Sequence, residues 1–255
     1  MDTSAYLNRI GYDGALEPNA STLCALHLAH LYAVPFENLN IHLHRPIILN
    51  HAALYEKIVT QQRGGFCYEA NGMFAWLLQQ LGFDVTLLSA RVASEDGSFG
   101  AEYDHLTLSV KCPADANSSA AYLADVGFGD SFVEPLCLDV EIEQSDGRRA
   151  YRIEQDGLYR MLWQKKYDGS WEKQYRFTLQ PRAFSEFEAM CVYHQTSPDS
   201  SFTRKRIITR ATPRGRVSLD GTRLIVTNDG IRTVQNVENS AQYDALLLEH
   251  FGVIL

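Results

Sequence analysis

The hydrophobic pattern of this chain changes period near Gly82, and this change limits the fold more than any other feature. Apolar residues follow helical spacing before Gly82, whereas strand-like runs rich in apolar and β-branched residues follow it. Asn19 or Ser21 would cap the first helix, and Asn50 would cap the second. The helical runs are 18–34, 50–62 and 67–82, and the first strand-like runs are 83–93, 103–112 and 120–128.

Three Asp-Gly pairs separate the next strand-like runs. They are Asp146-Gly147, Asp156-Gly157 and Asp168-Gly169. Asp-Gly between two strand-like runs is among the strongest short-range signals for a β-hairpin. The middle of the chain is therefore predicted to form an antiparallel sheet or barrel. Its strands are expected at 136–144, 149–155, 158–166 and 170–179.

The last part of the chain mixes both patterns. A helix is expected at 181–195, a strand meander at 215–237 and a closing helix at 240–252. The sequence has no internal repeat and no obvious linker, so we expect three compact subregions in close contact. The predicted fold class is α+β.

Composition excludes several classes of protein. The net charge of −8 argues against nucleic-acid binding, which needs a basic field. No apolar run approaches the length of a membrane span, and the first residues lack a signal-peptide pattern. The five cysteines are odd in number and form no C-x-x-C pair, so no disulfide framework or zinc site is expected. A cytoplasmic protein, monomeric or homodimeric, with free thiols fits this pattern.

Cys67 is the strongest candidate for chemistry. It follows Gly64 and Gly65 and opens a predicted helix, where the helix dipole would lower the pKa of a thiol. A cysteine nucleophile also needs a base and a group that orients the base. His105 in a strand and Asp125 at the end of the next strand would meet that need if the strands are neighbours. Taken singly, each of these residues has an ordinary structural explanation.

Five sequence motifs together resemble those of a known enzyme family. The stretches "VPFENLNIHL", "RGGFCYEANG", "YDHLTL", "DVGFGD" and "YHQTSPDSSFT…TPRGRVSL" resemble the arylamine N-acetyltransferase family of the bacterial type, over nearly the whole chain. The resemblance implies a catalytic triad of Cys67, His105 and Asp125. It also implies a helical bundle at 1–82 with the nucleophile, a β-barrel at 83–182 with the histidine and aspartate, and an α/β lid at 183–255.

The implied activity is a two-step acetyl transfer of the kind used in xenobiotic metabolism. The Cys67 thiolate would take the acetyl group from acetyl-CoA and pass it to an arylamine or arylhydrazine nitrogen, or to the oxygen of an N-hydroxyarylamine. His105 would act as base and acid, and Asp125 would fix its imidazole. Acetyl-CoA is a substrate in this scheme, and no bound cofactor or metal is expected.

Several further residues could support that site. Phe36, Phe66 and Phe128 would wall a flat aromatic pocket, with plain core packing as the alternative. Gly127 and Gly129 would let backbone N–H groups approach an acyl oxygen. Their approach to the CoA pyrophosphate is implied by the family resemblance alone.

For the charged residues and the histidines as well, a functional role is weighed against an ordinary structural one. Arg63 and Glu37 are expected to pair and brace the loop before Cys67. The basic cluster 203–206 would attract CoA phosphates, although a solvated strand or lid face is favoured. The pairs His27/His30, on a helix, and His42/His44, on a possible strand, are interpreted as ordinary histidines rather than metal ligands. Cys24, Cys112, Cys137 and Cys191 are expected to be small buried residues.

Three other functions stay open on the sequence. The first is an amide synthase of polyketide assembly with the same triad. The second is a cysteine hydrolase or a transglutaminase-like enzyme, and the third is a non-catalytic binding protein. Some relatives carry a further C-terminal segment near the cleft, so the ending "EHFGVIL" leads us to expect a more open cleft here.

Overall fold

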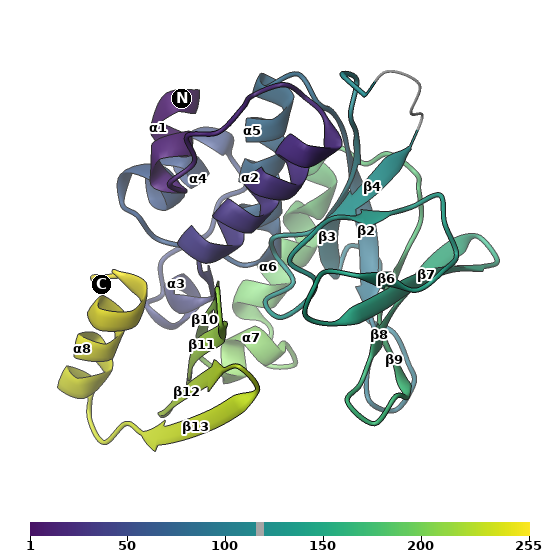
Figure 1. Cartoon of the computed structure of the whole chain (residues 1–255). Helices are drawn as coiled ribbons and strands as arrows, with labels where there is room; N and C mark the ends of the chain where they lie inside the picture. The colour runs from purple at the N-terminus through teal and green to yellow at the C-terminus, as the bar shows by residue number, and fades with distance from the viewer. Residues whose placement is uncertain (116–119) are drawn as a thin grey trace.

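The computed structural model describes residues 1–115 and 120–255 (Figure 1). The first part is helical, as predicted. Asn19 caps α2 by accepting from the Thr22 N–H, and Asn50 caps α4 by accepting from the N–H groups of Ala52 and Ala53. The helices are α1 (Thr3–Arg9), α2 (Ala20–Ala33), α3 (Leu39–His42), α4 (His51–Tyr55), a π-helical turn (Glu56–Thr60) and α5 (Cys67–Gln80).

The middle part forms one antiparallel eight-stranded sheet, a nearly closed barrel with the order β5-β4-β3-β2-β9-β8-β7-β6. Hairpins turn at each of the three Asp-Gly pairs, as predicted. The Gln144 side-chain amide links the two edge strands, because it donates to the Cys137 carbonyl and accepts from the Cys137 N–H. The strands are β2 (Asp84–Val92), β3 (His105–Lys111), β4 (Ala121–Ala124), β5 (Leu136–Cys137), β6 (Gln144–Ser145), β7 (Ala150–Asp156), β8 (Tyr159–Lys165) and β9 (Trp171–Phe177).

The predicted strand at 136–144 is wrong over most of its length. Only its two ends pair, in β5 and β6. Between them, Asp139, Glu141 and Glu143 are exposed, and Ile142 also faces solvent. A run of three carboxylates with no buried face has little to gain from a place in the sheet.

The C-terminal part is built on a second antiparallel sheet, with the order β1-β10-β11-β12-β13. Its first strand, β1 (Phe36–Glu37), comes from the helical part of the chain and pairs with β10. The division at residues 82/83 and 182/183 therefore stays a prediction. The other elements are a 3-10 turn (Phe184–Phe187), α6 (Glu188–Thr196), α7 (Ser201–Arg204), β10 (Ile207–Thr212), β11 (Gly215–Asp220), β12 (Arg223–Asn228), β13 (Ile231–Asn236) and α8 (Ser240–Phe251).

The possible strand around His42 and His44 is also wrong. His42 ends the short helix α3, and His44 has a left-handed backbone with φ of 52°. Asn38, directly before α3, anchors that helix, because its side chain bonds the backbone of Phe202 and Lys205 at α7 and of Ile207 at the start of β10. These contacts are distant in sequence, so the local pattern did not indicate them.

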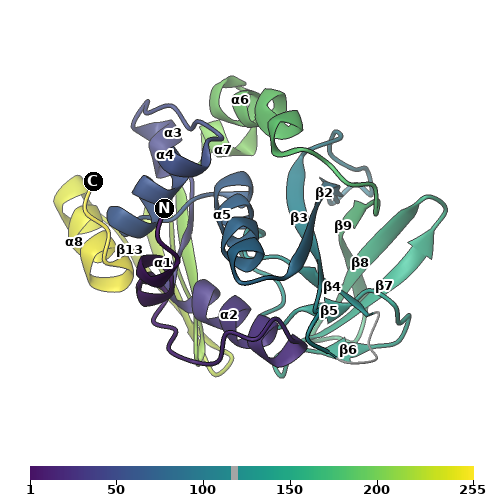
Figure 2. The same cartoon turned by 90° about the horizontal axis from the view of Figure 1, so that it is seen from above.

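Helix α5 lies at the centre of the molecule. Figure 2 shows it enclosed by α1, α2 and α4 on one side and by β2 and β3 on the other, in agreement with its contacts. Nearly every side chain of α5 is buried, including polar Glu69 and Asn71. No helix in the described part of the chain is both long and apolar enough to cross a membrane.

Candidate active site

The segment before Cys67 passes close to other backbone, which explains its glycines. A Cβ atom on Gly64 would lie 1.9 Å from the Pro35 carbonyl oxygen, and one on Gly65 would lie 2.5 Å from Cβ of Glu69. Phe66 is the N-cap of α5, and its N–H donates to the Glu69 carboxylate at 3.1 Å. Cys67 is then the first residue of the helix, as predicted, with 3% of its surface exposed.

Buried charges brace this segment. The predicted Arg63–Glu37 pair is confirmed, with Nη2 and Nε of Arg63 at 2.7 and 3.1 Å from Glu37 Oε1. Lys57 extends the network, because its ammonium lies 2.7 Å from Glu69 and 3.5 Å from Glu37. All four side chains are almost fully buried, so removal of one would leave an uncompensated charge.

His105 and Asp125 form a short hydrogen bond, with 2.6 Å between His105 Nε2 and Asp125 Oδ2. Asp125 also accepts from the Tyr175 hydroxyl at 2.9 Å, from Asn71 Nδ2 at 2.8 Å and from the Gly127 N–H at 3.0 Å. Burial alone would raise the pKa of Asp125, but the facing His105 and these donors outweigh it and hold the pKa below its usual value.

Asn71 joins this pair to the start of α5. It lies one turn after Cys67, donates to the Leu106 carbonyl as well as to Asp125, and accepts from the Val126 N–H. The turn after Asp125 packs directly on the helix, because a Cβ on Gly127 would lie 2.8 Å from Cα of Cys67. The structure thus places Cys67 at a helix start that packs against the turn after Asp125, the residue bonded to His105.

The electrostatics of Cys67 differ from the effect expected of a helix start alone. Burial raises the pKa of the Cys67 thiol well above its ordinary value, and the charges of Asp104 and Asp125 add to this. A hydrogen bond from the Leu106 backbone acts in the opposite direction without overcoming burial. An isolated thiolate is therefore disfavoured at this position.

The aromatic candidates lie near the His105–Asp125 pair and the start of α5. Phe128 packs edge-on against the His105 ring at 5.3 Å, and Tyr175 packs on both rings. Phe36 and Phe66 meet through Phe202, with ring centroids at 6.1 and 5.6 Å from it. Phe36 and Phe128 keep partial exposure, whereas Phe66 is fully buried.

Sequence reasoning missed Asn71 and Tyr175. Asn71 lies four residues after Cys67, so helical spacing alone would have placed it on the same face. Tyr175 lies in the middle of the predicted strand 170–179, and only the pairing of β9 with β2 brings it to Asp125.

Most of the cluster 203–206 contacts other residues of the C-terminal part of the chain. Arg206 stacks on the Tyr243 ring at 3.5 Å, and Lys205 pairs with Asp220 at 2.8 Å. Thr203 bonds the carbonyls of Ser197 and Ser200, which closes the "TSPDSSF" turn. These contacts engage Thr203, Lys205 and Arg206 within the C-terminal part of the chain, and the interpretation of the cluster as a solvated strand or lid face stays a prediction.

A basic cavity of about 1140 Å³ opens between the β6–β7 and β8–β9 hairpins of the barrel and the β10–β13 meander of the C-terminal sheet. Asp130 lines it, three residues after Gly127, and is held by Arg149 at 2.7 Å and Arg216 at 3.0 Å. Seven basic and four acidic side chains line it. The basic ones are Arg148, Arg149, Lys165, Lys166, Arg214, Arg216 and Arg232.

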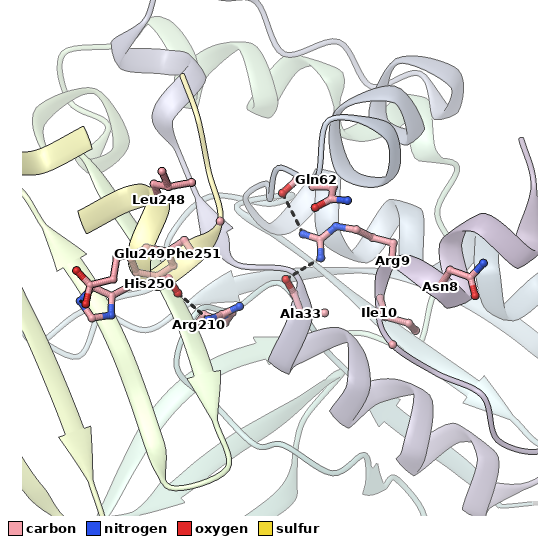
Figure 3. A pocket seen from close by; sticks show the side chains of 12 residues that line it. Asn8, Arg9, Ile10, Ala33, Gln62, Arg210, Leu248, Glu249, His250 and Phe251 are labelled. Atoms are coloured by element: carbon pink, nitrogen blue, oxygen red, sulfur yellow. Dashed lines mark hydrogen bonds and ion pairs between the residues drawn. The ribbon is translucent and has the colours of Figure 1, made fainter. Parts of the chain in front are cut away.

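A second cavity of about 480 Å³ lies between α1 and α8 (Figure 3). Arg9 points into it but donates to the carbonyls of Ala33, Ile58, Gln62 and Arg63. Arg210 likewise donates to the His250 carbonyl. Helix ends that present carbonyls favour cations, so these arginines fill the junction rather than prepare it for an anion.

Within residues 1–115 and 120–255, no group of three or more His, Cys, Asp or Glu side chains is arranged to hold a metal ion.

Comparisons with known proteins agree with this geometry. A family model described as N-acetyltransferase matches residues 19–255. The arylamine N-acetyltransferase of Mycolicibacterium smegmatis is 35% identical, over 100% of this chain and 93% of that protein. Human arylamine N-acetyltransferase 1 is 33% identical, over 84% of this chain and 79% of that protein. The structure of the Mycobacterium marinum arylamine N-acetyltransferase in complex with CoA superposes with a TM-score of 0.91 at 31% identity, over 99% and 93% of the two chains. The chain belongs to the arylamine N-acetyltransferase family, and it is an acetyltransferase.

Proposed function

We propose that this enzyme moves an acetyl group from acetyl-CoA to Cys67, and then to the nitrogen of an arylamine or arylhydrazine or to the oxygen of an N-hydroxyarylamine. The observation that carries the proposal is the 2.6 Å hydrogen bond between His105 and Asp125, beside the first residue of α5. Cys67 is the nucleophile, His105 the base and acid, and Asp125 the group that orients the imidazole.

In the first half-reaction, the Cys67 proton moves to His105. Because Asp125 engages Nε2, the nitrogen that receives this proton is Nδ1. Burial disfavours a lone thiolate, so the thiolate forms as an ion pair with the imidazolium that Asp125 stabilises. The sulfur attacks the thioester carbonyl, the bond from the acetyl carbon to the CoA sulfur breaks, and His105 returns the proton to the CoA thiolate.

In the second half-reaction, the acceptor attacks the acetyl-Cys67 carbonyl. His105 takes the proton that the nitrogen or oxygen loses, the carbon–sulfur bond breaks, and the Cys67 thiolate is restored beside the imidazolium. An aromatic amine of low basicity is mostly unprotonated at neutral pH, so its nitrogen lone pair is ready to attack.

Partly exposed Phe36 and Phe128 line the acceptor site in this proposal, and buried Phe66 shapes it from behind through Phe202. The N–H of Gly127 is engaged by Asp125, which leaves Gly129 to approach an oxygen of acetyl-CoA. Gly129 has φ of 93°, a conformation that favours glycine.

The basic cavity is the proposed site for the CoA phosphates. Three residues span at most about 11 Å, so the cavity wall at Asp130 begins close to Gly127 and Cys67. Arg148 donates hydrogen bonds to the Tyr32 hydroxyl and to the carbonyls of Thr212 and Pro213. Because these groups are neutral, the charge of the guanidinium stays available to an anion. Tyr167 is fully exposed at the rim and offers a ring face to the adenine.

Initial-rate kinetics test the proposal and separate it from its rivals. With acetyl-CoA and an aniline or hydrazine as varied substrates, we expect parallel double-reciprocal lines, because CoA leaves before the acceptor binds. Intersecting lines would contradict the covalent route. Free acetate at the same rate without an acceptor would indicate a hydrolase, and no turnover with acetyl-CoA would favour the amide synthase.

A further inference from the structure

His27 makes two hydrogen bonds from the middle of α2 and has no exposed surface. Its Nδ1 lies 2.9 Å from the Val133 carbonyl oxygen, and its Nε2 lies 3.1 Å from the Asp125 backbone nitrogen. A carbonyl can only accept and a backbone N–H can only donate, so Nδ1 carries the proton and Nε2 accepts. These two partners fix the tautomer of the ring. This histidine was expected to be an ordinary one.

The two partners are the ends of one irregular segment. Strand β4 ends at Ala124 and β5 begins at Leu136, so no sheet pairing holds residues 125–133. That segment carries Asp125, and also Gly127 and Phe128, which contact Cys67 and His105. One imidazole thus bridges both ends of the segment on which the proposed mechanism depends.

Neighbouring groups hold His27 and the segment in place. The ring stacks on Phe132 with 5.7 Å between centroids and 10° between planes, and Phe74 meets it edge-on. At the far end of the segment, the Val133 N–H donates to Asp146 at 2.9 Å. The segment is therefore clamped by α2 from one side and by the β6–β7 turn from the other.

We propose that His27 is a positioning residue that holds residues 125–133 so that the Asp125 carboxylate faces His105. This inference rests on the proposed function, because it assigns His27 a role in preparing the Cys67–His105 pair. His27 acts through the backbone of Asp125 and touches neither substrate nor the reacting atoms.

The role requires a neutral ring. Burial lowers the pKa of His27 to about 4, against the opposing effects of the Val133 carbonyl, Asp125 and Asp146. A second ring proton would face the Asp125 N–H, donor against donor, and would break that end of the bridge. The ring therefore keeps its acceptor throughout the neutral range.

His30 is a matched control. It lies one turn further along α2, is equally buried, and packs on the same Phe74 ring. Neither of its ring nitrogens has a hydrogen-bond partner among the described residues. Replacement of His30 therefore removes a similar ring from the same core without touching the segment.

The test compares His27→Leu, His27→Gln and His30→Leu by the rate at which iodoacetamide alkylates Cys67, measured between about pH 5 and about pH 9. In His27→Leu we expect alkylation at neutral pH to fall about tenfold, with the rise of the profile moved to higher pH. His27→Gln keeps one donor and one acceptor and should recover most of the rate. His30→Leu should follow the wild type.

Steady-state kinetics give the second readout. We expect kcat to fall about tenfold in His27→Leu, while KM for acetyl-CoA changes much less. A wild-type profile in His27→Leu, or an equal loss in His30→Leu, would overturn the inference. Should His27→Leu fail to fold, His27→Met removes the same bonds with a side chain that adapts to irregular space. Alkylation needs no acetyl-CoA, so a wild type that is alkylated normally but forms no acetyl-enzyme would refute the proposed function instead.

Discussion

Cys67 is the first residue of α5 and has a buried thiol, so a free thiolate there would lack solvation. In the proposed mechanism its ionisation depends on the imidazole of His105, which in turn depends on Asp125. The helix start was visible in the sequence as two glycines before a helical run. The burial that reverses the expected pKa shift was not visible there, because it comes from residues distant in sequence, such as Gly127.

His105→Ala tests the base directly. We expect kcat/KM for acetyl transfer to fall about 10³-fold or more, because thiolate formation and proton transfer fail together. Exposed His44→Ala is the control and should keep wild-type rates. Initial rates with acetyl-CoA and an arylhydrazine measure both variants, and a loss below about tenfold in His105→Ala would argue against the role.

The low pKa of His27 also predicts a pH dependence of stability. Between its ordinary pKa of 6.5 and about 4, the unfolded chain binds a proton that the folded chain does not. The free energy of unfolding therefore falls as the pH is lowered through this range. We expect urea unfolding to show that the free energy of unfolding falls between about pH 7.5 and about pH 5. This fall should be about 2 kcal/mol larger in the wild type than in His27→Gln. Equal decreases would contradict a buried neutral His27.

Among the elements, the hairpins and helices were predictable because their signals are local. Asp-Gly pairs fix the β7–β8 and β8–β9 turns, and Asn19 and Asn50 begin their helices. The stretch between β5 and β6 was not predictable. Its shape depends on the Gln144 side chain closing the barrel edge against Cys137, a contact that no local pattern encodes.

Gly64 gives a prediction for the segment that precedes α5. Gly64→Ala would force its Cβ onto the Pro35 carbonyl, so the backbone must shift, and we expect a loss of about 3 kcal/mol together with reduced Cys67 alkylation. Gly97→Ala is the control, since Gly97 has φ of 85° but open space around it, and should cost about 1 kcal/mol. Thermal unfolding of both variants measures the two losses. Equal shifts of Tm would mean that the close approach of Gly64 to the Pro35 carbonyl is unimportant for stability.

At the scale of the whole molecule, the candidate site is assembled from all parts of the chain. Cys67 comes from α5, and His105 and Tyr175 come from the barrel. Strand β1, which carries Phe36, pairs with β10 of the C-terminal sheet. Sequence motifs indicated the candidate catalytic side chains, because their residue types are unusual and their order is distinctive. Partners such as Asn71 and Tyr175 emerged only from tertiary packing.

The basic cavity lies between the barrel and the C-terminal sheet. Arg232→Ala removes an exposed charge from its lining and should raise KM for acetyl-CoA about threefold or more, with little change in KM for the acceptor. Arg45→Ala changes the net charge equally from an exposed position on another part of the chain. Equal effects of the two variants would show that only the overall charge matters.

Intact-protein mass spectrometry after brief exposure to acetyl-CoA, with no amine present, tests the central claim most directly. The account predicts a single acetyl adduct on Cys67, absent from Cys67→Ser, which disappears when an aniline or hydrazine acceptor is added. An unmodified wild-type protein with its acetyl-CoA unconsumed, or an adduct that persists in Cys67→Ser, would contradict it.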